Sequence, residues 1–488
     1  MAVLMLLFGT SLHADILYVK ANAPAGGNGS SWANAMNSLG DALFEAEMKP
    51  SVTEIWVAQG TYYPTDPFPD VIISGRAPDN RDNTFPLLKN VKIYGGFPNT
   101  GNPGMADRIA PSLRNLSQSS VLSGDINKDG TWAGNALQVV SAIGDVGNAV
   151  LDGFVITGGY GQNGNCKYTL TGTDLNWWPD DGGGIQVVCS SPTLSNLIFT
   201  NNVAYSGASI FITGRYYPGG VESLYTIIPE PKVTNCLFVN NLVQQGGSAI
   251  KSRDTNVKIT NVTISGNGMT AGEIEAHPTE RRSTIYFEFV LFSPAVPEIN
   301  NALIYGDLRQ EFVGDIVHFH DQGSVRIINN SLIQGLVENE KFAPYGTGNI
   351  FGDVPDPLFT APSNLDFTLK SGSPAINAGS NAKYNGSNKD LAGNPRIYGG
   401  TIDMGAYESQ TGSGTVIDKI HNVENAMVYV SDNVLTVNAK IAVALGVYDL
   451  TGKTILEKDV VAGITKIPLQ KGVYVVNVDG KSVKVISY

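Results

Sequence analysis

Acidic side chains and aromatic rings in the expected loops are the residues of this sequence best suited to bind a metal ion or another ligand. Asp125, Asn127 and Asp129 alternate as at the start of a calcium loop, in which side-chain oxygens at every second position ligate the ion. The twelfth position of such a loop needs a carboxylate, and here it is Ala136. This excludes an EF-hand and predicts a polar turn, with a partial Ca²⁺ site as the alternative and no other cofactor.

Exposed aromatic rings offer a different chemistry, since they can stack on sugars or anchor a protein partner. Five rings lie in two expected insertions, Trp177 and Trp178 in the first and Tyr216, Tyr217 and Tyr225 in the second. We take these five as candidate ligand-binding residues. The alternative is that the insertions fold back as a lid over the apolar outward column of the repeated strands described below.

Two further segments concentrate titratable side chains. They contain Glu273, Glu275, His277, Arg281 and Arg282 in one case, and His318, His320 and Asp321 in the other. We interpret the first as a solvated charged loop rather than a catalytic site. His318 falls in line with inward positions of earlier strands, which indicates a core or corner histidine.

The composition favours many short strands and excludes some partners. The chain has 488 residues, of which 42% are hydrophobic, 16% are charged and 55 are glycine. Glycine-rich sequences with little charge suit strands joined by tight turns. There are 32 basic and 44 acidic residues, a net charge of −12. A nucleic-acid partner is therefore not expected, because binding it requires a basic surface.

Internal repeats explain how these short strands are organised. Six segments superpose without gaps, at residues 152–157, 195–200, 234–239, 260–265, 300–305 and 329–334. A second set lies between them, at residues 184–187, 209–212, 249–252, 284–287 and 315–318. Two strands that recur in fixed order with variable insertions predict a parallel β-solenoid, in which each coil adds one strand to each sheet.

Alternation assigns faces to the repeated strands. In the first set the inward columns are apolar and an asparagine stands at the corner, at Asn196, Asn235, Asn261, Asn301 and Asn330. We expect a structural ladder there, with asparagines in the left-handed conformation that pass amide hydrogen bonds between coils. The outward column of this set is apolar too, so loops or another domain cover it, or it is adhesive.

The outward column of the second set bears directly on catalysis. It is predicted to contain Gln186, Phe211, Lys251, Tyr286 and Val317. Neither outward column holds a carboxylate, whereas a glycosidase needs two carboxylates and a lyase needs a base and a charge-neutralising group. This argues against an active site on the sheets.

The first residues, 1–14, are mostly apolar and end in small residues, as in a secretory signal peptide with the mature chain starting near Asp15. No later segment approaches the roughly 20 apolar residues of a membrane span. Of the three cysteines, Cys166 and Cys189 are a candidate disulfide pair, and Cys236 is expected as a buried thiol. Near the start, Ser38 can cap a short amphipathic helix that shields the end of the solenoid.

Several motifs resemble known families. The segments 17–20, 29–33, 54–62, 91–97 and 151–159 resemble the right-handed parallel β-helix surface proteins of Bacteroidetes, which are related to chlamydial polymorphic outer-membrane proteins. The segments 371–379, 390–396 and 402–408 resemble the choice-of-anchor Q domain. The segments 447–453, 471–476 and 481–485 resemble the C-terminal sorting domain of type IX secretion.

These resemblances imply an all-β chain, a right-handed parallel β-helix of the pectate-lyase type followed by a small β-sandwich. The expected parts are a signal peptide at 1–14, a β-helix with an N-terminal cap at 15–352, a choice-of-anchor Q-like cap of the solenoid at 353–409, a linker at 410–415 and a sorting domain at 416–488. The resemblance to sorting domains implies the type IX secretion machinery as a partner, and a location outside the cell or on its outer surface.

For the function itself, the sequence favours a non-catalytic adhesive, structural or glycan-binding role, with a glycan or a surface protein as ligand. The alternative is a polysaccharide lyase or glycoside hydrolase whose site lies in the loop insertions, since several β-helix families have such activity.

Overall fold

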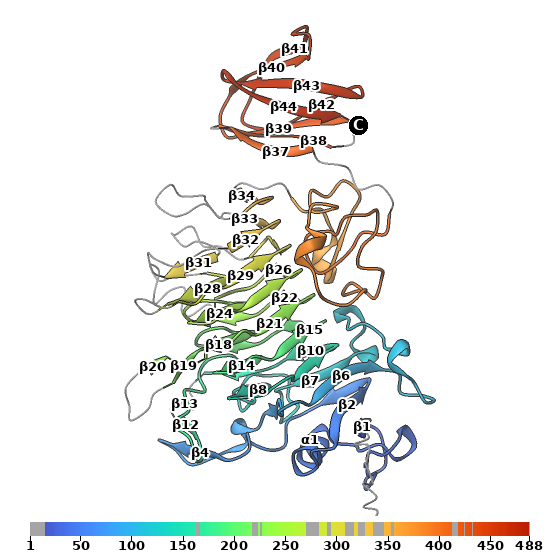
Figure 1. The fold of residues 1–488 in the computed structure, drawn as a ribbon, viewed down its shortest axis with the longest axis vertical. Helices are drawn as coiled ribbons and strands as arrows, with labels where there is room; N and C mark the ends of the chain where they lie inside the picture. The colour runs from blue at the N-terminus through green and yellow to red at the C-terminus, as the bar shows by residue number, and fades with distance from the viewer. Residues whose placement is uncertain are drawn as a thin grey trace, which may run out of the picture.

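The structure is a computed structural model of the whole chain. It describes residues 15–487 except 163–165, 217–222, 225–226, 270–282, 290–293, 308–316, 321–326, 335–345, 353–355, 412–417, 424 and 432. Strands dominate this part of the chain (Figure 1). No helix within the described ranges has the length and apolar character needed to cross a bilayer.

Three long parallel sheets form the body of the molecule. Sheet A contains β1 (Asp15–Val19), β2 (Val52–Ala58), β6 (Lys92–Phe97), β9 (Val150–Asp152), β15 (Thr193–Ser195), β21 (Lys232–Thr234), β25 (Lys258–Thr260), β29 (Glu298–Asn300) and β32 (Ile327–Asn329). Sheet B contains β3 (Gly60–Tyr62), β7 (Ser120–Ser123), β10 (Phe154–Thr157), β16 (Ile198–Thr200), β22 (Leu237–Val239), β26 (Thr263–Ser265), β30 (Leu303–Ile304), β33 (Leu332–Gln334) and β34 (Ile350–Gly352). Sheet C contains β5 (Phe85–Pro86), β8 (Val140–Ile143), β14 (Ile185–Val188), β18 (Ile210–Thr213), β24 (Ile250–Arg253), β28 (Ile285–Glu288) and β31 (Val317–His320).

Successive coils visit the three sheets in the same order. One coil, for example, contributes β15 to sheet A, β16 to sheet B and β18 to sheet C, and the next contributes β21, β22 and β24. A short fourth ladder of β11 (Tyr160–Gly161), β17 (Val203–Ala204), β23 (Leu242–Val243) and β27 (Gly268–Met269) fills the corner between sheets B and C. These stacked parallel strands are the arrangement expected of a β-helix.

The register of sheet B confirms the gapless superposition of the repeats. Val155 pairs with Ile198, and Ile198 pairs with Leu237. One position further along, Phe199 and Phe238 point inward and stack at 4.9 Å with an interplanar angle of 2°. Both rings are fully buried in a core that runs through the coils. Burial of these apolar columns is the main force that holds the coils together.

The asparagines at the corner between sheets A and B adopt the predicted left-handed conformation, with φ between 47° and 57° at Asn196, Asn235, Asn261, Asn301 and Asn330. Their amides link some coils directly. Asn235 Nδ2 donates to Asn196 Oδ1 at 2.6 Å, and Asn301 Nδ2 donates to Asn261 Oδ1 at 3.0 Å. No such bond joins Asn235 to Asn261. Their side-chain amides donate instead to backbone carbonyl oxygens of a later part of the chain.

A second ladder, which the sequence analysis did not predict, lies inside the opposite end of sheet B. Asn202 Nδ2 donates to Asn241 Oδ1 at 3.0 Å, and Asn241 Nδ2 donates to Asn267 Oδ1 at 2.9 Å. Asn267 in turn donates to Asp307 at 3.3 Å. All these side chains are buried, and the bonds satisfy polar groups that would otherwise destabilise the core.

The register at the end of sheet C corrects one sequence assignment. Val317 pairs with Ile285 and is buried in the core, and His318 pairs with Tyr286. The superposition had aligned His318 with Phe287, one residue away. A slip of one residue exchanges the two faces of a strand. His318 therefore occupies an outward register position, and its interpretation as a core or corner histidine is wrong.

The N-terminal coils are shielded by the predicted helix, α1 (Leu39–Met48). Ser38 caps it, because its Oγ accepts the backbone N–H of Asp41 at 3.1 Å. Leu39, Ala42, Leu43 and Ala46 face the core, as the amphipathic pattern predicts.

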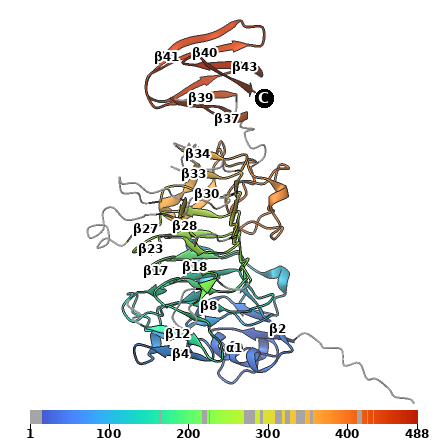
Figure 2. The same cartoon turned by 60° about the vertical axis from the view of Figure 1, so that its left-hand side comes forward.

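Residues 356–409, which we call the covering segment, lie along the side of the solenoid and not only over its last coil (Figures 1 and 2). Apart from the hairpin of β35 (Phe359–Ala361) and β36 (Asp366–Leu369), they are mostly irregular. Their apolar side chains pack on the outward column of sheet B, which includes Val155, Ile198 and Leu237. This resolves the open question of the apolar outward column, which is covered by a later part of the same chain.

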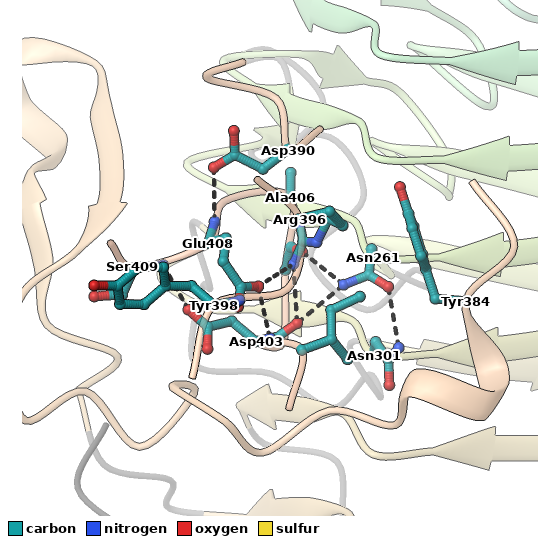
Figure 3. Close-up of polar contacts among 12 residues, drawn as sticks. Asn261, Asn301, Tyr384, Asp390, Arg396, Tyr398, Asp403, Ala406, Glu408 and Ser409 are labelled. Carbon is teal, nitrogen blue, oxygen red and sulfur yellow. Dashed lines mark hydrogen bonds and ion pairs between the residues drawn. The ribbon is translucent and has the colours of Figure 1, made fainter. Parts of the chain in front are cut away.

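The covering segment is attached through the first asparagine ladder (Figure 3). Asn261 Nδ2 donates to the carbonyl oxygens of Asp403 and Gly405, each at 3.0 Å. Arg396 Nη1 donates to Asn235 Oδ1 at 3.2 Å. The corner asparagines therefore bind the segment as well as each other.

The C-terminal region folds on a core of its own. One antiparallel sheet contains β37 (Asp418–Val423), β38 (Ala426–Ser431), β39 (Val434–Ala439) and β42 (Gly463–Pro468). A second contains β40 (Val443–Asp449), β41 (Thr454–Val460), β43 (Gly472–Val478) and β44 (Lys481–Ser487). Side chains of both sheets meet in one hydrophobic cluster that contains no residue of the solenoid.

Candidate functional site

The outward face of sheet C carries a group of paired charged side chains. Each four-residue strand has two outward positions. The first column contains Gln186, Phe211, Lys251 and Tyr286, and the second contains Val188, Thr213, Arg253 and Glu288. The sequence analysis followed the first column only, and it therefore missed Arg253 and the carboxylate of Glu288. A comparison of positions two residues apart on each strand would have found them.

Glu288 is the centre of this group. Arg253 contacts it through Nε at 3.2 Å and through Nη2 at 3.3 Å. Lys251 Nζ lies 3.5 Å from the same carboxylate, and Arg215 Nη1 lies 3.8 Å away. Arg215 pairs more closely with a second acid, Asp254, so the group holds three cations and two anions. All five side chains are mostly shielded from water. Such mutual pairing holds the charged ends in fixed positions.

A second carboxylate, Asp181, lies on the same face at the edge of β14. It forms an isolated parallel bridge with Ser206, whose Oγ accepts a hydrogen bond from Lys251 Nζ at 3.2 Å. Burial raises the pKa of Asp181 to about 6, although the charges of Lys251 and Arg253 oppose this shift. Asp181 Oδ1 is enclosed without a hydrogen-bond partner in the described part of the chain.

Two exposed rings stand beside Asp181 and Ser206. Trp178 is 49% exposed and Tyr205 is 41% exposed. The carbonyl of Trp178 accepts the side-chain amide of Gln186 at 2.7 Å, which fixes the chain next to the first outward column. A third ring, Tyr286, lies under the Lys251 ammonium at 5.2 Å. The outward face of sheet C thus combines aromatic rings with charged side chains that are held in place by ion pairs.

Glycines let the backbone pack closely against this face. Gly182, Gly207 and Gly247 precede three neighbouring strands of sheet C with φ values of 75°, 60° and 74°. A Cβ on Gly247 would come within 2.9 Å of the Lys251 Cβ. Glycine is required here because the turn is left-handed and lies directly against the outward column.

The insertion around Trp177 forms a lid, as in the alternative interpretation, but it lies over sheet C and not over the apolar outward column of sheet B. Trp177 is only 4% exposed and packs edge-on against Tyr168 and Phe68. Its strand, β13 (Asn176–Trp177), pairs with β12 (Lys167–Leu170), which pairs with β4 (Val71–Ser74). This small sheet covers the outward residues Ile143 and Val188 of sheet C.

The other candidate rings are only partly described. Tyr216 lies in β19 (Arg215–Tyr216), paired with β20 (Ser223–Leu224). Tyr217 and Tyr225 lie outside the described residues, as do the loop residues Glu273, Glu275, His277, Arg281, Arg282 and Asp321. In β31, His320 pairs in register with Glu288.

The calcium-like segment forms a closed polar turn. The Asp125 carboxylate accepts the backbone N–H groups of Asp129 at 3.1 Å and Gly130 at 3.0 Å. Asn127 donates to Asp129 Oδ2 at 2.9 Å. The side-chain oxygens expected to ligate an ion thus bind the turn itself, and Ca²⁺ binding stays a prediction. Elsewhere in the described ranges, no group of three or more His, Cys, Asp or Glu residues is placed to hold a metal.

The three cysteines are buried free thiols. Cys166 and Cys189 share a hydrophobic cluster under the lid without a disulfide between them. Burial raises the pKa of the Cys166 thiol to about 11 and that of the Cys189 thiol to about 12. Neither is suited to be a nucleophile, because the thiolate is the reactive form.

Comparison with known proteins gives little further information. No family model matches the chain, and no curated protein does. Among solved structures, the chain is similar to PfbA, a surface adhesin of Streptococcus pneumoniae, with 12% identity and a TM-score of 0.27. The match covers 70% of this chain and 82% of that one. A likeness this distant supports no argument about function.

Proposed function

We propose that the protein is a non-catalytic glycan-binding β-helix that acts outside the cell or on its surface. The observation that carries this proposal is the position of Trp178 and Tyr205, two exposed rings next to the fixed charges of sheet C. Sugar rings have apolar faces that stack on aromatic side chains, and their hydroxyl groups bond to carboxylates and cations at the ring edge.

The arrangement supports binding over cleavage. Asp181 lies at the start of the coil of β14, and Glu288 lies three coils further along. At about 4.8 Å per coil, the two carboxylates stand about 14 Å apart along the solenoid axis. Glycosidases hold their two carboxylates about 5–9.5 Å apart. Asp254 lies one coil from Glu288, but it is paired with Arg215 and almost completely shielded from solvent, so it is not placed to act on a substrate. A site of this length suits an extended chain that lies along the axis.

We further propose the finer features of the chain. The β-helix is right-handed, since connections between parallel strands of one sheet are right-handed in about 98% of cases. The two C-terminal sheets form a β-sandwich that serves as a sorting domain for type IX secretion, and residues 1–14 are a signal peptide. Their separate hydrophobic core supports an independent role for the C-terminal sheets.

The test is a glycan array probed with the protein and with Trp178→Ala and Tyr205→Ala. We expect each variant to weaken binding to the preferred glycan by at least tenfold, because stacking on one ring contributes a large share of the affinity at such sites. Phe44→Ala is the matched control, because this ring is 66% exposed on α1, which shields the N-terminal coils of the solenoid. Equal binding by all four proteins would refute the site.

Activity is tested on the same glycans and on pectin, alginate and glycosaminoglycans. We expect no new reducing ends and no unsaturated products, with or without Ca²⁺. Turnover that is lost on substitution of Glu273, Glu275 or His277 would instead support the polysaccharide-active alternative.

A further inference from the structure

A cleft of about 550 Å³ lies where the covering segment meets the corner between sheets A and B. Three parts of the chain form its walls. They are residues 105–111, the corner at Gly153 and Asn196, and residues 387–393. Clefts of 300–1,000 Å³ at such junctions are typical of small-ligand sites. This cleft is on a different face from the sheet C site.

The two basic side chains that line the cleft differ in their pairing. Arg108 is held in place, because its guanidinium pairs with the Asp152 carboxylate and donates to the Gly95 carbonyl at 2.7 Å. Lys389 is exposed, and its ammonium has no ion pair or hydrogen bond in the described part of the chain. The carboxylate of Asp390, which also lines the cleft, accepts backbone N–H groups of Asn394 at 2.7 Å and Glu408 at 2.8 Å. Lys389 therefore offers an exposed ammonium to an anionic ligand.

The lining of the cleft also contains apolar side chains. Met105 is 40% exposed and Ile109 is 41% exposed, and both line the cleft with Pro111 and Leu391. Exposed apolar side chains in a concave site indicate a ligand with an apolar face as well as a charge.

An aromatic column leads into the cleft along sheet A. Tyr18 pairs with Trp56, Trp56 with Tyr94, and Tyr94 with Asp152, so that one outward position carries three rings before it reaches the cleft. The rings are partly exposed. Arg108 joins the two features, since it lines the cleft and lies 5.1 Å from the centre of the Tyr94 ring. A ligand made of repeated rings can follow this column at one ring per coil.

We propose that the cleft binds the acidic terminal sugar of a glycan chain, with Lys389 paired to its carboxylate or sulfate group. The apolar side chains contact the face of this sugar. Arg108 lies over the Tyr94 ring and Phe97 stacks on Trp56, so the next sugars lie along the exposed edges of Tyr94 and Trp56. This site rests on its own contacts and does not depend on the site on sheet C.

The proposal is tested by calorimetric titration with glucuronic acid, glucose 6-sulfate and glucose. The two acids are expected to bind at least tenfold more tightly than glucose, and their relative affinities show whether a carboxylate or a sulfate is preferred. Lys389→Met should remove this preference and Lys389→Arg should keep it. Lys383→Met is the control, because this lysine is exposed on the same segment but does not line the cleft.

Two results would overturn the proposal, namely equal affinity for glucose and the acids, or unchanged acid binding by a folded Lys389→Met variant. The aromatic column is tested with a tetramer of galacturonic acid, expected to bind at least tenfold more tightly than the monomer, and equal affinities would remove the column from the site. Trp178→Ala should leave these titrations unchanged, which distinguishes failure of this site from failure of the site on sheet C.

Discussion

The Arg396 guanidinium lies 3.3 Å from the Glu408 carboxylate, and both side chains are almost completely shielded from solvent. Two further carboxylates, Asp403 and Asp390, are buried close by (Figure 3). The carboxylates accept backbone N–H groups of the covering segment, as in the bonds from Tyr398 to Glu408 at 2.8 Å and from Ser409 to Asp403 at 2.7 Å. The three buried carboxylates thus hold the irregular backbone of the covering segment in place around the Arg396 guanidinium.

The covering segment should be more stable at pH 5 than at pH 8. Burial raises the pKa of Glu408 to about 7 and that of Asp403 to about 6. An acid whose pKa is raised by folding stabilises the fold at low pH, and this contribution is lost as the pH rises through the folded-state value. The loss for Glu408 is on the order of 3 kcal/mol.

Hydrogen exchange of the amides at 390–409 measures this dependence. We expect faster exchange at pH 8 after correction for the intrinsic rate, and a flatter profile in Glu408→Gln. Asp459→Asn, an exposed carboxylate in β41, should leave the profile unchanged. Protection that rises with pH would contradict the assignment.

Replacement of Arg396 by Met should destabilise the covering segment by about 3–5 kcal/mol, since it leaves buried carboxylates without their counter-ion. The loss should be largest at alkaline pH and smaller at pH 5, where Glu408 is protonated. Thermal unfolding at the two pH values measures it. A loss independent of pH would show that packing of the Arg396 side chain, and not its charge, is what matters.

Phe199→Ala or Phe238→Ala should destabilise the solenoid by about 3–5 kcal/mol, because either change empties a packed core. Phe44→Ala, at an exposed ring, should cost less than about 0.5 kcal/mol. The free energies of unfolding of the three variants are measured by denaturant titration. Lys251, also predicted at an outward position, is not suitable as a control, because its ammonium contacts Ser206 and Glu288.

Removal of residues 416–488 should leave the solenoid folded, since the two C-terminal sheets have their own core. If these sheets are the sorting domain, the truncated protein should accumulate in the periplasm of a host with type IX secretion. Fusion of the same segment to a foreign exported protein should carry that protein to the surface. Cell fractionation measures how much of each protein reaches the surface. Equal surface amounts of full-length and truncated protein would rule out the sorting role.

Repetition explains which features could be predicted from the sequence. The register of sheet B and the left-handed asparagines recur in many coils, so that each copy supports the others. The core position of Phe199 follows from the inward apolar columns of the repeated strands. These features depend on local geometry and on a spacing that the sequence displays directly.

The charged face of sheet C was harder to predict because it depends on single residues. Glu288 has no counterpart in the preceding coils, and His318 was displaced by a shift of one residue. Asp181 belongs to an insertion, and its proximity to Lys251 depends on how the chain returns to the sheet. The contact of Arg396 with Asn235 joins residues 161 positions apart, and no short-range pattern specifies such a pair.

The covering segment also changes how the molecule bears mechanical load. A bare solenoid contacts itself only between neighbouring coils, so that a pull on one end can peel the coils off in sequence. Here Arg114, ahead of β7, pairs with Asp366 at 2.7 Å, and Ser380 bonds to Asn301 far along the stack. Tension at the last coil is therefore shared with the early coils, which resists stepwise unravelling under shear.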